Sequence, residues 1–276
     1  MPKGKRTSDI EARREKERTR ARRENGRRRE KRKKTFKIFL YLILGLLLIA
    51  VLATLSFTVF FKISALEVSG ETIYSDEQII EASGILEGQN MLALNTSEIE
   101  KRVTKSLPYI KRLDIKRRLP SKIELIAEAG EAFIGIKSEN DFILADSAYK
   151  VLEHSDSCNC ITVIGVVPEV ADPGEKLQLG AQTEKILTNV LNAISTEGLE
   201  RISKIDLTSP VDIKLLYKEK YVLKLGNDDA LAYKLKFCQK VAETESEEGV
   251  IDVSALDADN NKGYYRAKAI AEDIAE

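Results

Sequence analysis

Residues 38–61 read IFLYLILGLLLIAVLATLSFTVFF, and these twenty-four positions carry no charged side chain. As an α-helix the stretch would be about 36 Å long, whereas the hydrocarbon core of a bilayer is about 30 Å thick. A buried helix in a soluble protein rarely lacks a polar face over such a length. We therefore predict a single membrane-spanning helix over residues 36–61.

The segments on either side of this stretch carry opposite charge. Residues 1–35 hold seventeen Lys and Arg against six Asp and Glu, whereas the whole chain has 44 of each class, so residues 62–276 are acidic overall. Basic flanks stay in the cytoplasm, which predicts a single-pass type II protein with residues 62–276 outside the membrane. A cleaved signal peptide is the competing interpretation, but its apolar core would have only about 7 to 15 residues.

Both ends of the chain are too polar to fold alone. Residues 1–35 form a basic cytoplasmic tail that we expect to contact anionic lipid headgroups. Specific nucleic-acid binding is not predicted, because no aromatic residues are interleaved with the basic ones and no folded nucleic-acid-binding motif accompanies them. Residues 268–276 form an acidic C-terminal tail.

Residues 62–130 predict a small domain with the order β-α-α-β-β. Ser75 and Gln78 have the spacing of a capping box, which indicates a helix that ends at Gly84. Ser97 and Glu100 repeat that spacing and predict the start of a second helix, which ends before Pro108. Alternating apolar residues predict strands at residues 63–70, 109–117 and 122–128.

Residues 131–267 predict a second, β-rich domain with flanking helices, so the fold class is α+β. Apolar periodicity near 3.6 residues marks helices at residues 186–194 and 231–242. Period-two alternation and turn residues indicate strands. These are expected at residues 133–137, 142–145, 161–167, 205–207, 211–217, 221–225, 249–254 and 263–267.

Four short sequences carry a resemblance to a known family. They are LEVSG at residues 66–70, GILEGQNML at 84–92, LPYIK at 107–111 and RRLPSKI at 117–123. Together they resemble the POTRA domain of the FtsQ/DivIB family of bacterial cell-division proteins. The layout of basic tail, single span, POTRA domain and β domain is also similar. The family's Asp-x-x-Gly-x-Val turn is echoed at residues 146–151, with Tyr149 in the place of the glycine.

The resemblance implies a non-enzymatic scaffold of the division septum. It would bind FtsB/DivIC-like and FtsL-like membrane proteins and help couple septum assembly to septal peptidoglycan synthesis. Exposed strand edges suit this role, because a partner can add a strand to them. By resemblance, the partner-binding residues are Val253, Gly263, Tyr264, Tyr265, Arg266 and Ala267. A weaker candidate edge comprises Leu113, Ile115 and Arg117. The alternative is a single-POTRA accessory of a protein transport or secretion system.

The sequence shows no arrangement of residues that is typical of a catalytic, cofactor or metal site, and we predict no enzyme, no cofactor and no metal site. Walker, dinucleotide-binding, nucleophile-elbow and zincin motifs do not occur in the sequence. His154, Asp156, Cys158 and Cys160 are potential zinc ligands, but the two cysteines are closer together than in the usual zinc knuckle. Cys238 falls at a helical core position and is interpreted as a small apolar residue.

Overall fold

The structure is a computed structural model that describes residues 37–52, 54, 60–139, 141–256, 262–267 and 274. The chain divides into two units by its internal contacts. One unit comprises residues 1–62 with 119–121, and the other comprises residues 63–118 with 122–276.

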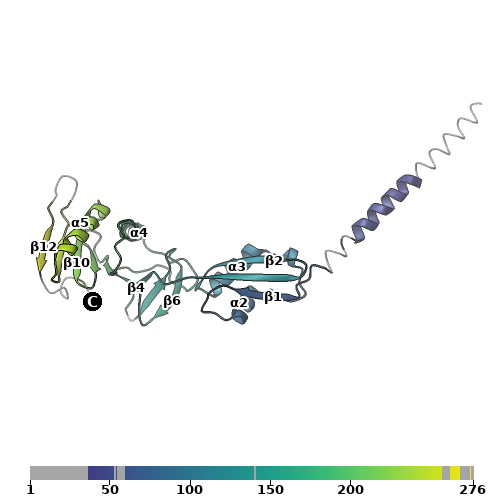
Figure 1. Cartoon of the computed structure of the whole chain (residues 1–276), viewed down its shortest axis with the longest axis horizontal. Coiled ribbons are helices and arrows are strands. Elements are labelled where there is room, and N and C mark those ends of the chain that lie inside the picture. The colour runs from purple at the N-terminus through teal and green to yellow at the C-terminus, as the bar shows by residue number, and fades with distance from the viewer. Residues whose placement is uncertain are drawn as a thin grey trace, which may run out of the picture. The chain divides into compact units, whose positions relative to one another are not determined.

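In the first unit, residues 37–52 are helical and are drawn in purple in Figure 1. Their apolar side chains are exposed. Across the described residues, no helix has both the length and the apolar character that crossing a membrane requires. Residues 36, 53 and 55–59 of the predicted span lie outside the described part of the chain, as does the tail at residues 1–35.

The second unit begins with a three-stranded sheet in the order β1-β3-β2 (Figure 1). Strand β1 (Ala65–Ser69) pairs in parallel with β3 (Lys122–Ala129), and β2 (Ile110–Arg118) pairs with β3 in antiparallel. Alternate residues Ile123, Leu125 and Ala127 of the central strand are buried, as period-two alternation predicts. The predicted β-α-α-β-β order is therefore present, and β1 and β2 form the two edges of the sheet.

Two helices supply the other half of this core. Helix α2 (Asp76–Ser83) starts with the predicted capping box at Ser75 and ends at Gly84, which adopts a left-handed conformation. A short 3-10 turn, η1 (Met91–Ala93), precedes α3 (Thr96–Ser106). The predicted cap at Ser97 is wrong, because the side chain of Asn95 already accepts a hydrogen bond from the Glu98 N–H and the helix begins at Thr96.

In the described residues, the rest of the second unit is built on a nine-stranded mixed sheet. Its strand order is β12-β11-β10-β9-β8-β7-β4-β5-β6, so β12 and β6 are the edge strands. In chain order, the first five strands of this sheet are β4 (Ile134–Lys137), β5 (Phe142–Ala145), β6 (Val151–Ser155), β7 (Ile161–Ile164) and β8 (Ile202–Asp206). The others are β9 (Ile213–Tyr217), β10 (Tyr221–Gly226), β11 (Gly249–Asp252) and β12 (Tyr264–Ala267).

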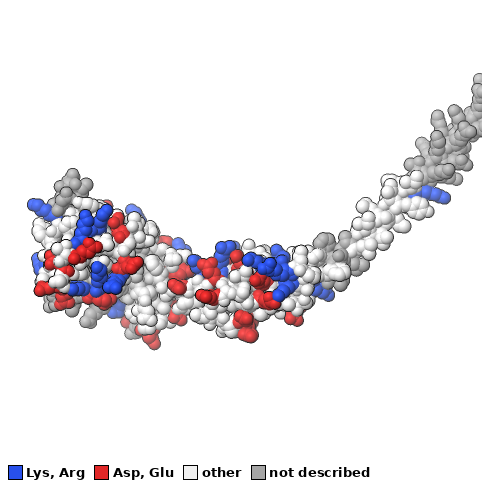
Figure 2. Space-filling model, viewed as in Figure 1, with Lys and Arg blue, Asp and Glu red and all other residues white. Residues whose placement is uncertain are grey.

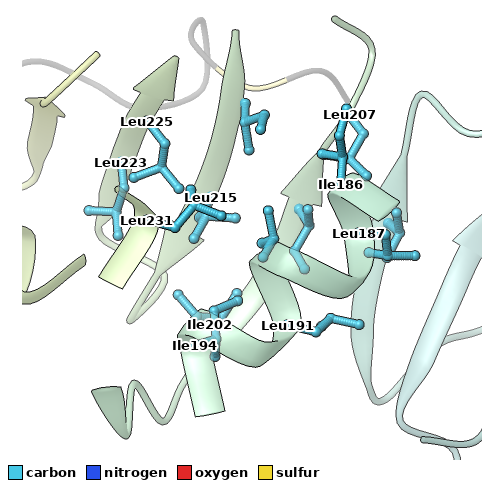
Figure 3. Close-up of a cluster of buried hydrophobic side chains, with 14 of the residues drawn as sticks. Ile186, Leu187, Leu191, Ile194, Ile202, Leu207, Leu215, Leu223, Leu225 and Leu231 are labelled. Atoms are coloured by element: carbon cyan, nitrogen blue, oxygen red, sulfur yellow. The ribbon is translucent and has the colours of Figure 1, made fainter. Parts of the chain in front are cut away.

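Helices α4 (Ala181–Glu197) and α5 (Leu231–Thr244) contribute to the core of this sheet. Figure 3 shows Ile194 of α4 beside Ile202 of β8, and Leu231 of α5 beside Leu215 and Leu223 of the neighbouring strands. Leu225 lies in the same cluster, whereas Val222 packs on the other face with Val250. Burying such a side chain stabilises the fold by roughly 1.5–3 kcal/mol, so this core holds the strand order in place.

One predicted strand differs from the structure around residues 146–167, and one predicted turn is present. The strand predicted over residues 161–167 ends at Ile164, because Gly165 turns the chain with φ +77°. In the turn after β5, the Asp146 carboxylate accepts hydrogen bonds from the Ala148 and Lys150 N–H groups, and Tyr149 adopts φ +63°. A tyrosine therefore occupies a backbone conformation that normally favours glycine.

Candidate partner-binding strands

Among the residues that the structure describes, strand β12 forms one edge of the nine-stranded sheet and pairs on one side only, with β11. The register is antiparallel and sets Tyr264 opposite Asp252, and Tyr265 opposite Ile251. An edge strand leaves a row of backbone N–H and C=O groups that an added strand can pair with. The sequence-predicted residues 264–267 therefore coincide with a sheet edge.

The two adjacent tyrosines face opposite sides of the sheet. Tyr264 is 65% exposed, whereas Tyr265 packs against the buried core and donates a hydrogen bond from its hydroxyl to the Glu247 carbonyl at 3.1 Å. Desolvation raises the pKa of the Tyr265 phenol, and the nearby Glu245 carboxylate acts in the same direction. Tyr265 thus stays neutral and structural, while Tyr264 is the aromatic side chain available to a partner.

The remaining predicted residues differ in accessibility. Val253 is fully buried, and its N–H donates to the Lys224 carbonyl at 2.9 Å, so its side chain does not reach the surface. A Cβ added to Gly263 would lie 2.5 Å from the Phe237 ring, which means that the chain approaches α5 closely there. Arg266 and Ala267 are exposed. The accessible part of the site is therefore Tyr264, Arg266 and Ala267.

Strand β2 carries the weaker candidate edge. Leu113 is buried and Ile115 is half-buried, so neither presents a large apolar surface. The Arg117 guanidinium donates to the Met91 and Leu94 carbonyls at 2.9 and 2.8 Å, which fastens the η1 turn to the end of the strand. Figure 2 shows blue basic side chains gathered over part of the region of β1 to β3. The β2 edge could offer its backbone and basic side chains, but no apolar anchor.

Comparison with known proteins finds similarity to bacterial cell division proteins. Residues 61–126 match the POTRA domain, FtsQ-type. Cell division protein DivIB of Clostridium acetobutylicum is 26% identical over 213 residues, which are 75% of this chain and 85% of that protein. DivIB of Clostridium tetani is 28% identical over 221 residues, 76% and 83% respectively. Cell division protein FtsQ of Corynebacterium glutamicum is 26% identical over 170 residues, 61% and 73%. The chain is similar to the DivIB and FtsQ cell division proteins over most of its length.

Both ring nitrogens of His154 lie within hydrogen-bond distance of other groups of the protein. Its Nδ1 lies 3.0 Å from the Asp141 carboxylate and its Nε2 lies 2.9 Å from the Ala171 carbonyl. Both nitrogens therefore face acceptors, and these bonds raise the pKa of the imidazole. In the described parts of the chain, no group of three or more His, Cys, Asp or Glu side chains could hold a metal ion.

One buried charge of the protein was not predicted from the sequence. Lys234 of α5 is 1% exposed, and its ammonium donates to the Leu225 carbonyl at 2.7 Å and to the Asn227 side-chain oxygen at 3.0 Å. It thereby fastens α5 to the end of β10, two strands away from β12. A lysine at a helical core position, four residues before Cys238, is the signal that could have identified it.

Proposed function

We propose that this protein is a non-enzymatic scaffold of the bacterial division septum. It binds FtsB/DivIC-like and FtsL-like membrane proteins by strand addition at β12 and helps couple septum assembly to septal peptidoglycan synthesis. The assignment to cell division is supported by the DivIB and FtsQ names of its relatives. These names favour division over transport or secretion.

The observation that carries the binding part of the proposal is the exposed edge at β12. Tyr264 is 65% exposed, and such an amphipathic ring can bury a large area at an interface at low entropic cost. Arg266 is on the same face of the strand as Tyr264, because the two residues are two positions apart. A partner strand would thus gain main-chain hydrogen bonds from β12 and side-chain specificity from Tyr264 and Arg266.

The proposed location is the cell membrane at the septum. Residues 36–61 would act as an anchor, and residues 62–276 would lie outside the membrane. Support comes from the uncharged run at residues 38–61 and from the basic residues that precede it.

The test is capture of a purified FtsB/DivIC-like coiled-coil protein by the full chain in detergent, with Tyr264→Ala as the variant. We expect at least a tenfold loss of affinity, because a central interface tyrosine commonly contributes about 2 kcal/mol. Tyr233→Ala is the matched control, since Tyr233 is an exposed tyrosine on α5. If the unaltered chain captures no such protein, the scaffold proposal is wrong; if Tyr264→Ala binds normally, only the site is wrong.

A further inference from the structure

The connection between β6 and β7 brings two thiols together. Cys158 and Cys160 lie in this loop with their Sγ atoms 2.8 Å apart, and neither is in a disulfide. Two sulfur atoms in a disulfide are about 2.05 Å apart, so the thiols are placed for a bond with little movement of the loop. The third cysteine, Cys238, is fully buried in the core and cannot join them.

The sheet itself holds Cys158 in position. A Cβ added to Gly135 of β4 would lie 2.5 Å from the Cys158 sulfur, so the absence of a side chain at this strand position makes room for the thiol. The Cys158 thiol also lies 3.4 Å from the Cys160 carbonyl oxygen. Both cysteines are only partly buried, which leaves the pair open to a reagent from solvent.

We propose that Cys158 and Cys160 form a redox-active dithiol that exchanges with disulfide donors. One thiol loses its proton and attacks a sulfur of the donor, which releases one donor thiol and leaves a mixed disulfide. The other thiol then loses its proton, attacks the cysteine sulfur of that bond and releases the second donor thiol. The pair is oxidised by two electrons to the Cys158–Cys160 disulfide, and the donor disulfide is reduced to two thiols.

The surroundings favour Cys158 as the first nucleophile. Desolvation and the hydrogen bond with Cys158 raise the pKa of the Cys160 thiol to about 12, so Cys160 keeps its proton at neutral pH. The bond would close a loop of only three residues, and such a short loop gains little from a constrained unfolded state. We therefore expect the oxidation of the pair to be reversible, and the Cys158–Cys160 bond not to act as a permanent structural disulfide.

This inference goes beyond the scaffold role. It rests on the proposed function in one respect only: the domain must lie outside the cytoplasm, where disulfide donors that can oxidise the pair are maintained. The exchange chemistry belongs to the pair itself and would persist if the scaffold proposal failed.

The experiment treats the reduced, desalted full chain in detergent with 5,5′-dithiobis(2-nitrobenzoic acid), a chromogenic disulfide. We expect the native protein to release two thionitrobenzoate ions and to end two mass units lighter, with no adduct. The second release should not depend on reagent concentration, because it is intramolecular. Cys238 should react only after denaturation, and it serves as the internal reference for folding.

The variant Cys158→Ser separates exchange from simple labelling. It should release one thionitrobenzoate ion in the native state and keep a stable adduct on Cys160. The rate of this release should be at least tenfold lower than the rate of the first release from the unaltered chain. Cys160→Ser should instead keep its adduct on Cys158. An unaltered chain that ends with adducts on both cysteines, or that releases no thionitrobenzoate while folded, would overturn the proposal.

Discussion

At the scale of single residues, Lys234 shows how a buried charge can be compatible with a stable core. Its ammonium is satisfied by the Leu225 carbonyl and by both the main-chain and side-chain oxygens of Asn227. We predict that Lys234→Met lowers the free energy of unfolding by about 1–3 kcal/mol, because it leaves a buried carbonyl without a donor. Urea unfolding would measure the loss. Lys236→Met, at an exposed position of the same helix, should change the stability by less than about 0.5 kcal/mol.

His154 predicts a pH dependence of stability. Its hydrogen bonds to Ala171 and Asp141 raise its pKa above the ordinary value of 6.5. The stabilisation is therefore complete below about pH 6.5 and is lost as the pH rises through the folded-state pKa. The side chain is 43% exposed, so the effect should stay below about 1 kcal/mol.

The measurement is the difference in free energy of unfolding between the unaltered chain and His154→Gln. This difference should be larger at pH 5.5 than at pH 8.5. A difference that grows with pH would contradict the charged-histidine interpretation.

At the scale of elements, two glycines with similar backbone angles should tolerate alanine differently. Gly165 after β7 has φ +77°, and an added Cβ would lie 2.2 Å from the Thr208 nitrogen. Gly198 after α4 has φ +63°, and an added Cβ would meet no atom within 4 Å. Gly198→Ala should cost only the left-handed penalty of about 1–2 kcal/mol, whereas Gly165→Ala should cost clearly more.

Thermal unfolding of the two alanine variants under identical conditions would check this. Equal shifts in melting temperature would mean that the loop after β7 moves away from Thr208 at little cost.

The elements were largely predictable because their signals are local. The capping box at Ser75 and the glycine at residue 84 bound α2, and the apolar period of α4 matches its buried face. The cap at Asn95 was missed because Ser97 offers the same pattern two residues later. Strand order, and hence the edge position of β12, depends on pairing between residues far apart in the sequence, so it came from family resemblance and not from periodicity.

The candidate site was predictable only in part, for a similar reason. Local alternation places Tyr264 and Tyr265 on opposite faces but does not say which face is covered. That is decided by α5 and by the core that contains Ile251 and Val253. The burial of Val253 and the contact between Gly263 and Phe237 likewise arise from tertiary packing.

At the scale of the whole molecule, the charge difference between residues 1–35 and residues 62–276 should determine topology. Changing Lys31, Arg32, Lys33 and Lys34 to Glu reverses the charge of the basic block that precedes the apolar run, and the positive-inside rule counts charges within about 15–20 residues of the membrane. We predict that this variant inserts with mixed orientation. The matched control changes Arg13, Arg14, Lys16 and Arg18 to Glu, which are the same number of charges farther from the span, and it should keep the original orientation.

Protease treatment of intact spheroplasts that carry the chain with an N-terminal epitope tag would measure orientation. In the unaltered chain and in the control, residues 62–276 should be digested while the tag is protected. In the Lys31 to Lys34 variant, a fraction of the tag should become accessible and the same fraction of the C-terminal domains should become protected. If the tag is digested in the unaltered chain, the type II orientation is wrong, and neither strand addition at β12 nor dithiol oxidation at Cys158 would then take place outside the membrane.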